Sequence, residues 1–235
     1  MSIKEINGNI FNSSLQTIVN TVNCDGVMGK GIALEFKLRY PQMFDYYVSM
    51  CKKKLLSPGK LLLWQKSNPW ILNFPTKDHW KNSSKLEYIE LGLKKLISMY
   101  EIKGITSIAF PILGAASGGL REVDVLKTMY KYLQPLNNLI IEIYHFNQNA
   151  SDELFTKFYQ RTINFQIVDF MEKLNLNKKQ ALIIKRALNY HTLENMQDLQ
   201  KLDGIGEKTI SKIYEYAMIT PRRIITLEER QQLLL

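Results

Sequence analysis

Short apolar runs and helix-like segments alternate along about the first 150 residues of the chain. In the segment 86–99, for example, Leu86, Ile89 and Leu93 recur at the spacing of one buried helix face. The alternation predicts an α/β sandwich or a three-layer sheet. Strands are expected at 3–6, 18–22, 61–65, 70–74, 105–112 and 139–146, and helices at 30–38, 44–54, 86–99 and 123–133.

The pattern changes after about residue 150, where the strand signals stop. Only helical spacing follows, so the sequence predicts two domains, 1–150 and a small all-α domain over 151–235. Helices are expected in the tail at 154–159, 165–174, 178–189, 193–199 and 209–218, with 227–235 as a final helix or a frayed end.

The charge balance favours a polyanionic partner. The formal net charge is +9 over 235 residues, and a surplus of this size attracts nucleic acid or anionic membranes. No apolar segment is long enough to cross a bilayer, and the first residues lack the pattern of a secretory leader. Nucleic acid is therefore the favoured partner, and a cytoplasmic location is expected.

Composition also limits the chemistry. Two cysteines are too few for a disulfide framework or a cysteine-rich zinc site, and three scattered histidines, His79, His145 and His191, form no ligand cluster. We therefore expect no structural metal and no bound cofactor.

Two glycine-rich segments each follow a predicted strand and precede a predicted helix. The first lies at 19–37 and the second, FPILGAASGGL, at 110–120. Backbone amides that no side chain covers can approach a phosphate closely, and the amino end of a helix favours an anion. Two such loops predict a diphosphate ligand.

Between these loops, the segment NFPTKDHW at 73–80 places Lys77 just past a strand end. In a basic protein, most such lysines are surface residues, and composition alone favours that interpretation for Lys77. Lys30, inside the first loop, is interpreted as a phosphate-neutralising cation. His79 and Trp80 are candidates to stack on a base, or to pack the loop from outside. Asp25 is a candidate to orient a water or ribose hydroxyls, although Asp in a turn more often bonds its own backbone.

The tail contains LDGIGEKT at 202–209, in which Gly204 and Gly206 flank Ile205 ahead of a predicted helix. This pattern resembles helix-hairpin-helix domains, which imply contact between helix-start amides and a nucleic-acid phosphate. The other interpretation is a glycine-containing bend between two helices. Under the first interpretation, the DNA-binding residues are Gly204, Gly206, Lys208, Thr209 and Lys212, and the chain end adds Arg222 and Arg223.

The segments GNIF at 8–11, VNTVNCDGVMGKGIALEFK, NFPTKDHW and FPILGAASGGL, in this order and spacing, resemble the macrodomain, an ADP-ribose-binding module. More narrowly, they are similar to its DNA ADP-ribosyl glycohydrolase branch, the DarG-type antitoxins. The resemblance covers about residues 1–150. It implies a three-layer α/β/α fold with a mixed central sheet, followed by the helix-hairpin-helix-like tail.

The resemblance also implies roles for residues of this sequence. Asn9, where many relatives carry Asp, and Ile10 match the adenine end, and Asn20 and Asn23 match polar positions near the distal ribose. Ala115 and Ala116 stand where relatives often have a Cys-Gly pair. The implied ADP-ribose-binding set is completed by Gly29, Lys30, Gly31, Ile32, Ala33, Thr76, Leu113, Gly114, Ser117, Gly118, Gly119 and Leu120.

In the glycohydrolase branch, the lysine of the FPTK segment is the catalytic residue, so the resemblance assigns catalysis to Lys77. A glycosidic bond breaks through an oxocarbenium-like state, and a nucleophile that forms a covalent ribose adduct divides that step in two. An amine attacks only when it is unprotonated. Burial under Phe74 and Trp80, and a nearby cation such as Lys30, would therefore have to lower its pKa.

Three functions remain open. The favoured one is a hydrolase that removes ADP-ribose from a nucleic-acid base and holds DNA through the tail. It would reverse the modification made by a DNA-modifying toxin. The second is a non-catalytic reader of ADP-ribosylated DNA or protein, which needs the phosphate loops and not Lys77. The third is a hydrolase of ADP-ribosylated or acylated small molecules or proteins, with a tail that serves only assembly.

Overall fold

The computed structural model describes residues 3–190 and 193–219. The expectations that concern His191, Arg222, Arg223 and the segment 227–235 lie outside these ranges. Within them, each predicted strand is present at nearly the expected bounds.

Six strands form one mixed sheet in the order β1-β6-β5-β2-β4-β3. All hydrogen-bonded neighbours run parallel except β3 and β4, which are antiparallel. The mixed sheet is as expected. The strands are β1 (Lys4–Gly8), β2 (Thr17–Val22), β3 (Leu62–Trp64), β4 (Trp70–Pro75), β5 (Ser107–Pro111) and β6 (Ile140–Phe146).

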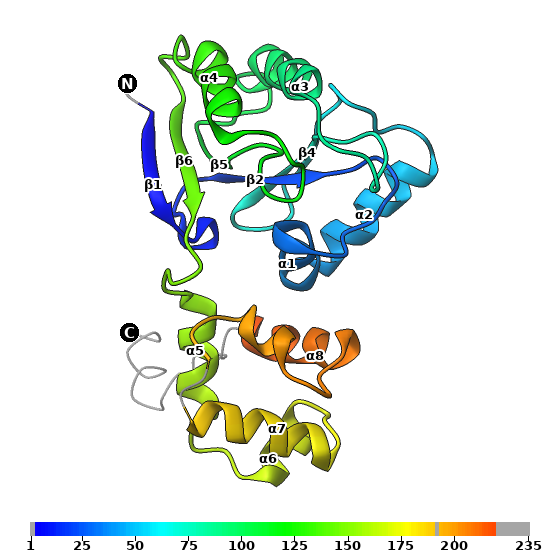
Figure 1. The fold of residues 1–235 in the computed structure, drawn as a ribbon, viewed down its shortest axis with the longest axis vertical. Helices are drawn as coiled ribbons and strands as arrows, with labels where there is room; N and C mark the ends of the chain where they lie inside the picture. The colour runs from blue at the N-terminus through cyan, green and yellow to red at the C-terminus, as the bar shows by residue number, and fades with distance from the viewer. Residues whose placement is uncertain (1–2, 191–192, 220–235) are drawn as a thin grey trace, which may run out of the picture.

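Helices cover both faces of the sheet, which confirms the three-layer α/β/α fold (Figure 1). α1 (Gly31–Arg39) and α2 (Pro41–Lys52) lie on one face, and α3 (Leu86–Met99) and α4 (Glu122–Leu133) on the other. A single 3₁₀ turn, η1 (Ile10–Asn12), follows β1. Each face has its own buried apolar cluster because residues of a strand alternate between the two sides.

The helices after β6 form a separate apolar cluster, here called the helical domain (residues 153–219). They are α5 (Glu153–Thr162), α6 (Ile167–Lys173), α7 (Lys178–Asn189), the 3₁₀ turn η2 (Asp198–Lys201) and α8 (Glu207–Met218). In the described part of the chain, no helix combines the length and apolar character that crossing a membrane requires.

The helix expected over 193–199 is wrong. In its place lies an irregular turn that leads into η2. The Asp198 carboxylate accepts hydrogen bonds from the backbone N–H groups of Glu194 and Asn195, and the Asn195 side chain accepts one from the N–H of Asp198. Such side-chain bonds to the backbone compete with the helical ladder.

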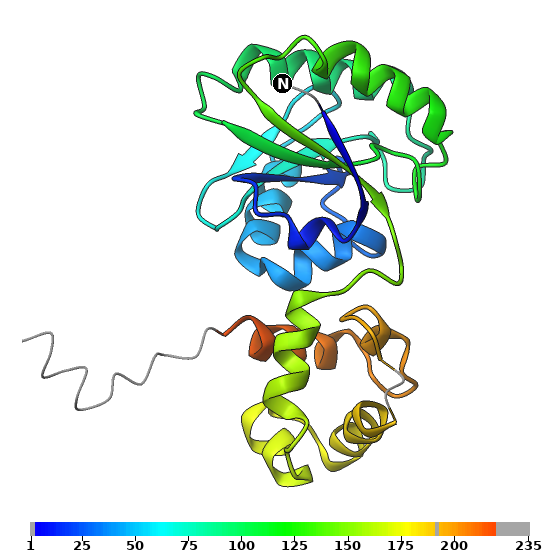
Figure 2. The same ribbon diagram turned by 90° about the vertical axis from the view of Figure 1, so that its left-hand side faces the viewer.

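The helical domain packs beneath α1 of the α/β domain, with α8 against α1 (Figures 1 and 2). Leu38 of α1 belongs to the domain's own apolar cluster. Beside it lies a buried ion network, in which the Arg39 guanidinium bonds both Glu35, 2.6 Å away, and Asp152, 3.2 Å away. All three side chains are less than a tenth exposed. Each charge has lost its contact with water, and the opposite charges beside it compensate for that loss.

Replacing Arg39 with Leu is expected to destabilise the protein by about 3 kcal/mol or more, because it leaves two buried carboxylates without a counter-ion. Urea unfolding followed by circular dichroism measures the change. Arg121→Leu, which breaks an exposed pair with Asp124, is the control and should not change the unfolding midpoint. An unchanged midpoint for Arg39→Leu would show that the joint does not depend on this network.

Candidate functional site

A cavity of about 520 Å³ lies along the carboxyl ends of the parallel strands. This edge is where the loops after parallel strands meet, so residues far apart in the sequence converge there. The lining residues are Gly8, Asn9, Ile10, Phe11, Thr21, Val22, Asn23, Val27, Gly29, Lys30, Gly31, Ile32, Ala33, Glu35, Thr76, Lys77, Trp80, Pro111, Ile112, Gly114, Ala115, Ala116, Ser117, Gly118, Glu122, Tyr144, Phe146 and Gln197.

The strand order divides the cavity into three zones. Loops after β1 and β6 supply one end, loops after β5 and β2 the middle, and the loop after β4 the other end. Both predicted glycine-rich segments therefore fall in the middle zone, facing each other. A Cβ added to Gly31 in the first loop would lie only 3.5 Å from the Ser117 hydroxyl in the second.

The second glycine loop presents unpaired backbone amides. The N–H groups of Ala116, Ser117 and Gly118 have no acceptor among the described residues. The loop requires glycine at 118, because a Cβ there would stand 2.1 Å from the carbonyl oxygen of Gly114. Successive free N–H groups in such a turn form an anion-binding nest.

The first glycine loop ends in the amino terminus of α1, which begins at Gly31. The first N–H groups of a helix have no partner within the helix and carry the positive end of its dipole. Lys30 stands immediately before this helix and lines the same zone. The middle of the cavity can therefore accept an anion such as a phosphate.

Lys77 lies at the β4 end and reaches across to the second glycine loop. Its Nζ donates a hydrogen bond to the carbonyl oxygen of Ser117 at 2.8 Å. Removal from water, and to a smaller extent the positive charge of Lys30, lowers the pKa of Lys77. The expected burial of Lys77 under Phe74 is not found. The Phe74 ring packs under Gly92 of α3, in the apolar cluster on that face of the sheet.

Contacts with the first glycine loop hold the Lys77 loop in place. The Cys24 thiol donates to the carbonyl oxygen of Lys77 at 3.3 Å, and the Asp25 carboxylate accepts the N–H of Trp80 at 2.8 Å. Burial, the largest cause, raises the pKa of Cys24 to about 12, so this neighbouring sulfur stays a thiol and is no competing nucleophile. Through its bond to the N–H of Trp80, Asp25 holds the loop that carries Lys77.

The end formed after β1 and β6 combines apolar and hydrogen-bonding groups. Phe11, Tyr144 and Phe146 give it aromatic walls. Glu35 of α1 and Gln197 of the helical domain add polar groups that the sequence analysis missed. A single glutamine in a segment expected to be helical, 193–199, carries no sign of a ligand site, so the sequence does not indicate Gln197.

Several expected site residues lie outside the cavity lining. Asn20 is fully buried in the sheet, where its amide donates to Asn73 on β4 at 2.9 Å. Asn23 does line the cavity, but its side chain bonds Val27 and Tyr47 and so shapes the loop. The other expected residues that the lining does not include are Asp25, Leu113, which is fully buried, Gly119, Leu120 and His79, whose ring stacks with that of Trp80.

The tail motif is placed at the start of α8. Gly204 has a positive φ of 84° and Gly206 caps the helix, while Lys208 is exposed. Thr209 is buried, with its hydroxyl accepting a bond from Gln180 at 2.7 Å, and Lys212 donates to the carbonyl of Asn175. The Thr209 hydroxyl is therefore committed to the domain interior.

No group of three or more His, Cys, Asp or Glu side chains suited to a metal occurs in the described ranges. The two cysteines, Cys24 and Cys51, are both free thiols.

Comparison with known proteins identifies the family of this fold. The family model for the Macro domain matches residues 19–129. The solved macrodomain of Mycobacterium tuberculosis DarG is 41% identical with a TM-score of 0.59, and the match covers 61% of this chain and 97% of that structure. This chain belongs to the macrodomain family.

Two further matches place this macrodomain near one branch. The M. tuberculosis protein named DNA ADP-ribosyl glycohydrolase is 44% identical over 141 residues, which is 58% of this chain and 40% of that protein. The structure of Thermosipho africanus DarTG in complex with ADP-ribose is 36% identical with a TM-score of 0.57, and the match covers 63% of this chain and 42% of that one. The chain spans about two fifths of the length of the curated relatives named DNA ADP-ribosyl glycohydrolase.

Lys77 of the macrodomain is expected to titrate below the exposed lysines, and Lys30→Met should raise its pKa. Removing a neighbouring positive charge favours the protonated amine, but burial remains, so the pKa should stay below the ordinary value. NMR titration of ¹³C-methylated lysines measures it, with the exposed Lys103→Met as control. A Lys77 signal that titrates with the exposed lysines would contradict the geometry.

Proposed function

We propose that this macrodomain chain is an ADP-ribosyl glycohydrolase that removes ADP-ribose from a modified base of DNA. The three zones of the cavity match the three parts of the ligand. Aromatic walls at the β1–β6 end suit a nucleoside, free amides in the middle suit a diphosphate, and the β4 end receives the distal ribose. The relatives named DNA ADP-ribosyl glycohydrolase supply the substrate class.

The observation that carries this proposal is the position of Lys77. Its amine stands at the β4 end, next to the phosphate-binding loop, and its lowered pKa increases the unprotonated fraction near neutral pH. A purely binding site does not need a partly buried amine there. Ligand binding would displace the Ser117 carbonyl from Lys77 and free the amine.

In this mechanism the Lys77 Nζ attacks the anomeric carbon of the distal ribose. The Nζ–C bond forms as the bond from that carbon to the base nitrogen breaks, and a water passes the proton that Nζ loses to the leaving base nitrogen. A second water then hydrolyses the ribose adduct, which releases ADP-ribose and regenerates the amine. The glycine loops would hold the diphosphate throughout and so orient the ribose.

The modified base would enter beside Trp80. This side chain lines the cavity and is 48% exposed, so its ring offers a flat surface at the mouth. Stacking on such a ring holds a base without selecting its sequence. Asp25 keeps Trp80 in place through its backbone N–H.

DNA contact through the helical domain is part of the proposal. The bond from Gln180 to Thr209 brings the amino ends of α7 and α8 side by side. The exposed Lys178 and Lys208 stand at these two ends, where helix dipoles already favour an anion. Together they offer a cationic surface for the phosphate backbone, without base recognition.

The reaction also implies a partner activity. A glycohydrolase of this kind acts on the product of a DNA ADP-ribosyltransferase, so we propose that a toxin of that class supplies its substrate in the cytoplasm. The resemblance to DarG-type antitoxins supports this context.

Lys77→Ala is expected to lose at least about a hundredfold in release of ADP-ribose from an ADP-ribosylated oligonucleotide, because the nucleophile is removed. The wild-type protein and Lys77→Ala are compared at equal ADP-ribose occupancy, which calorimetry measures. Lys103→Ala, an exposed lysine far from the cavity, should retain wild-type release. Tight binding without release by the wild-type protein would make the chain a reader; full release by Lys77→Ala would exclude the mechanism.

Replacing both Lys178 and Lys208 with Glu is expected to weaken DNA binding and to make the dependence of log affinity on log salt shallower by about 1.5. Fluorescence anisotropy with labelled single- and double-stranded oligonucleotides measures both. The matched control, Lys95→Glu with Lys103→Glu, changes the net charge equally on the other domain. Equal losses in the two double variants would assign the effect to net charge and reject the proposed surface.

A further inference from the structure

Gln197 is the one residue of the helical domain, as far as that domain is described, that lines the cavity. It enters at the β1–β6 end, beside Glu35 of α1. We propose that Gln197 recognises the exocyclic amine of the adenine base and so makes the helical domain part of the nucleotide site. This inference rests on the proposed function, because it takes ADP-ribose as the ligand.

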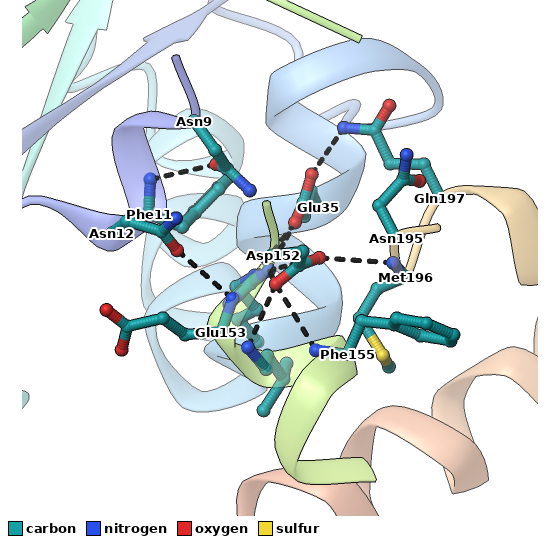
Figure 3. A network of polar contacts seen from close by, with 12 residues as sticks. Asn9, Phe11, Asn12, Glu35, Asp152, Glu153, Phe155, Asn195, Met196 and Gln197 are labelled. Atoms are coloured by element: carbon teal, nitrogen blue, oxygen red, sulfur yellow. Dashed lines mark hydrogen bonds and ion pairs between the residues drawn. The ribbon is translucent and has the colours of Figure 1, made fainter. Parts of the chain in front are cut away.

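The orientation of the Gln197 amide follows from its partner. Its Nε2 donates to the Oε2 of Glu35 at 2.6 Å (Figure 3). A carboxylate only accepts hydrogen bonds, so the atom that faces it must be the NH₂ group. Arg39 holds the other oxygen of Glu35 with two bonds, at 2.9 and 2.6 Å, which fix the position of this carboxylate. The Oε1 of Gln197 is left pointing away from Glu35, and it has no partner among the described residues.

The segment that carries Gln197 is held to the joint between the domains. The N–H of Met196 donates to the buried Asp152 carboxylate at 3.1 Å, and the Asn195 amide donates to the carbonyl of Gln148. Figure 3 shows the bond from Met196 to Asp152, close to Glu35. Gln197 thus projects from a fixed backbone, as a residue that recognises a ligand requires.

Asn9 supplies the opposite hydrogen-bonding group. Its Oδ1 accepts the N–H of Phe11 at 3.0 Å, and because that N–H only donates, the Nδ2 of Asn9 must face away from it. In Figure 3, Asn9 and Gln197 are seen on either side of Glu35. The same end of the cavity therefore offers a free acceptor from Gln197 and a free donor from Asn9.

Adenine is complementary to this pair. Its edge presents an amine donor, N6, next to a ring acceptor, N1, which match the Gln197 Oε1 and the Asn9 Nδ2. Hypoxanthine presents the reverse pattern, a carbonyl acceptor next to a protonated ring nitrogen. The aromatic walls beside these groups, Phe11 and Phe146, contact a base face without distinguishing the two.

The test is calorimetry of the full chain with ADP-ribose and with its hypoxanthine analogue. Gln197→Met keeps a side chain of similar length but replaces the amide oxygen with a thioether sulfur, which is only a weak acceptor. It should weaken ADP-ribose binding about fivefold, the value of one hydrogen bond, and leave the analogue within about twofold. Gln200→Met is the matched control. Gln200 lies in the same segment, donates to the Tyr214 hydroxyl and does not line the cavity, so both affinities should be retained.

The outcomes separate the two proposals. Failure of the wild-type protein to bind ADP-ribose would reject the proposed function itself. If the wild-type protein binds and Gln197→Met binds equally well, or loses both ligands equally, the role of Gln197 is overturned. Gln197→Leu serves as a second variant, and urea unfolding confirms that each variant keeps the joint between the domains.

Discussion

The buried ion network around Arg39 is the interaction on which both domains depend. One guanidinium neutralises Glu35 on its own helix and Asp152 at the start of α5, and lies over the Phe11 ring at 4.3 Å. None of these charges is stable in the interior alone, so the network forms only when the helical domain is seated beneath α1. The same Glu35 then orients Gln197.

The second constraint is the geometry of the parallel sheet. Parallel strands end at a common edge, so the loops after β1, β6, β5, β2 and β4 line one continuous cavity in an order set by the sheet. This order places aromatic walls, unpaired backbone amides and the amine of Lys77 in a row. A ligand with a base, a diphosphate and a ribose has the same order of parts.

Part of the site was predictable from local patterns. The glycine loops and the position of Lys77 past a strand end follow from composition and strand periodicity, which act over a few residues. Asn20 shows where such reasoning stops. The family resemblance implied a ligand contact for Asn20, but strand alternation turns its side chain into the core, where Asn73 pairs with it. The pairing partner is 53 residues away in the sequence, beyond any local pattern.

The sequence by itself determined the alternating α/β order, the two glycine-rich loops and the all-helical tail, because periodicity and turn chemistry are local properties. Four short sequence segments also carried the family resemblance. Only the tertiary structure decided which polar side chains line the cavity. It placed Gln197 in the cavity and Asn20 outside it, and it assigned Asp25 and Cys24 to holding the Lys77 loop. These roles depend on contacts between segments that only the assembled sheet and the buried charges of the joint bring together.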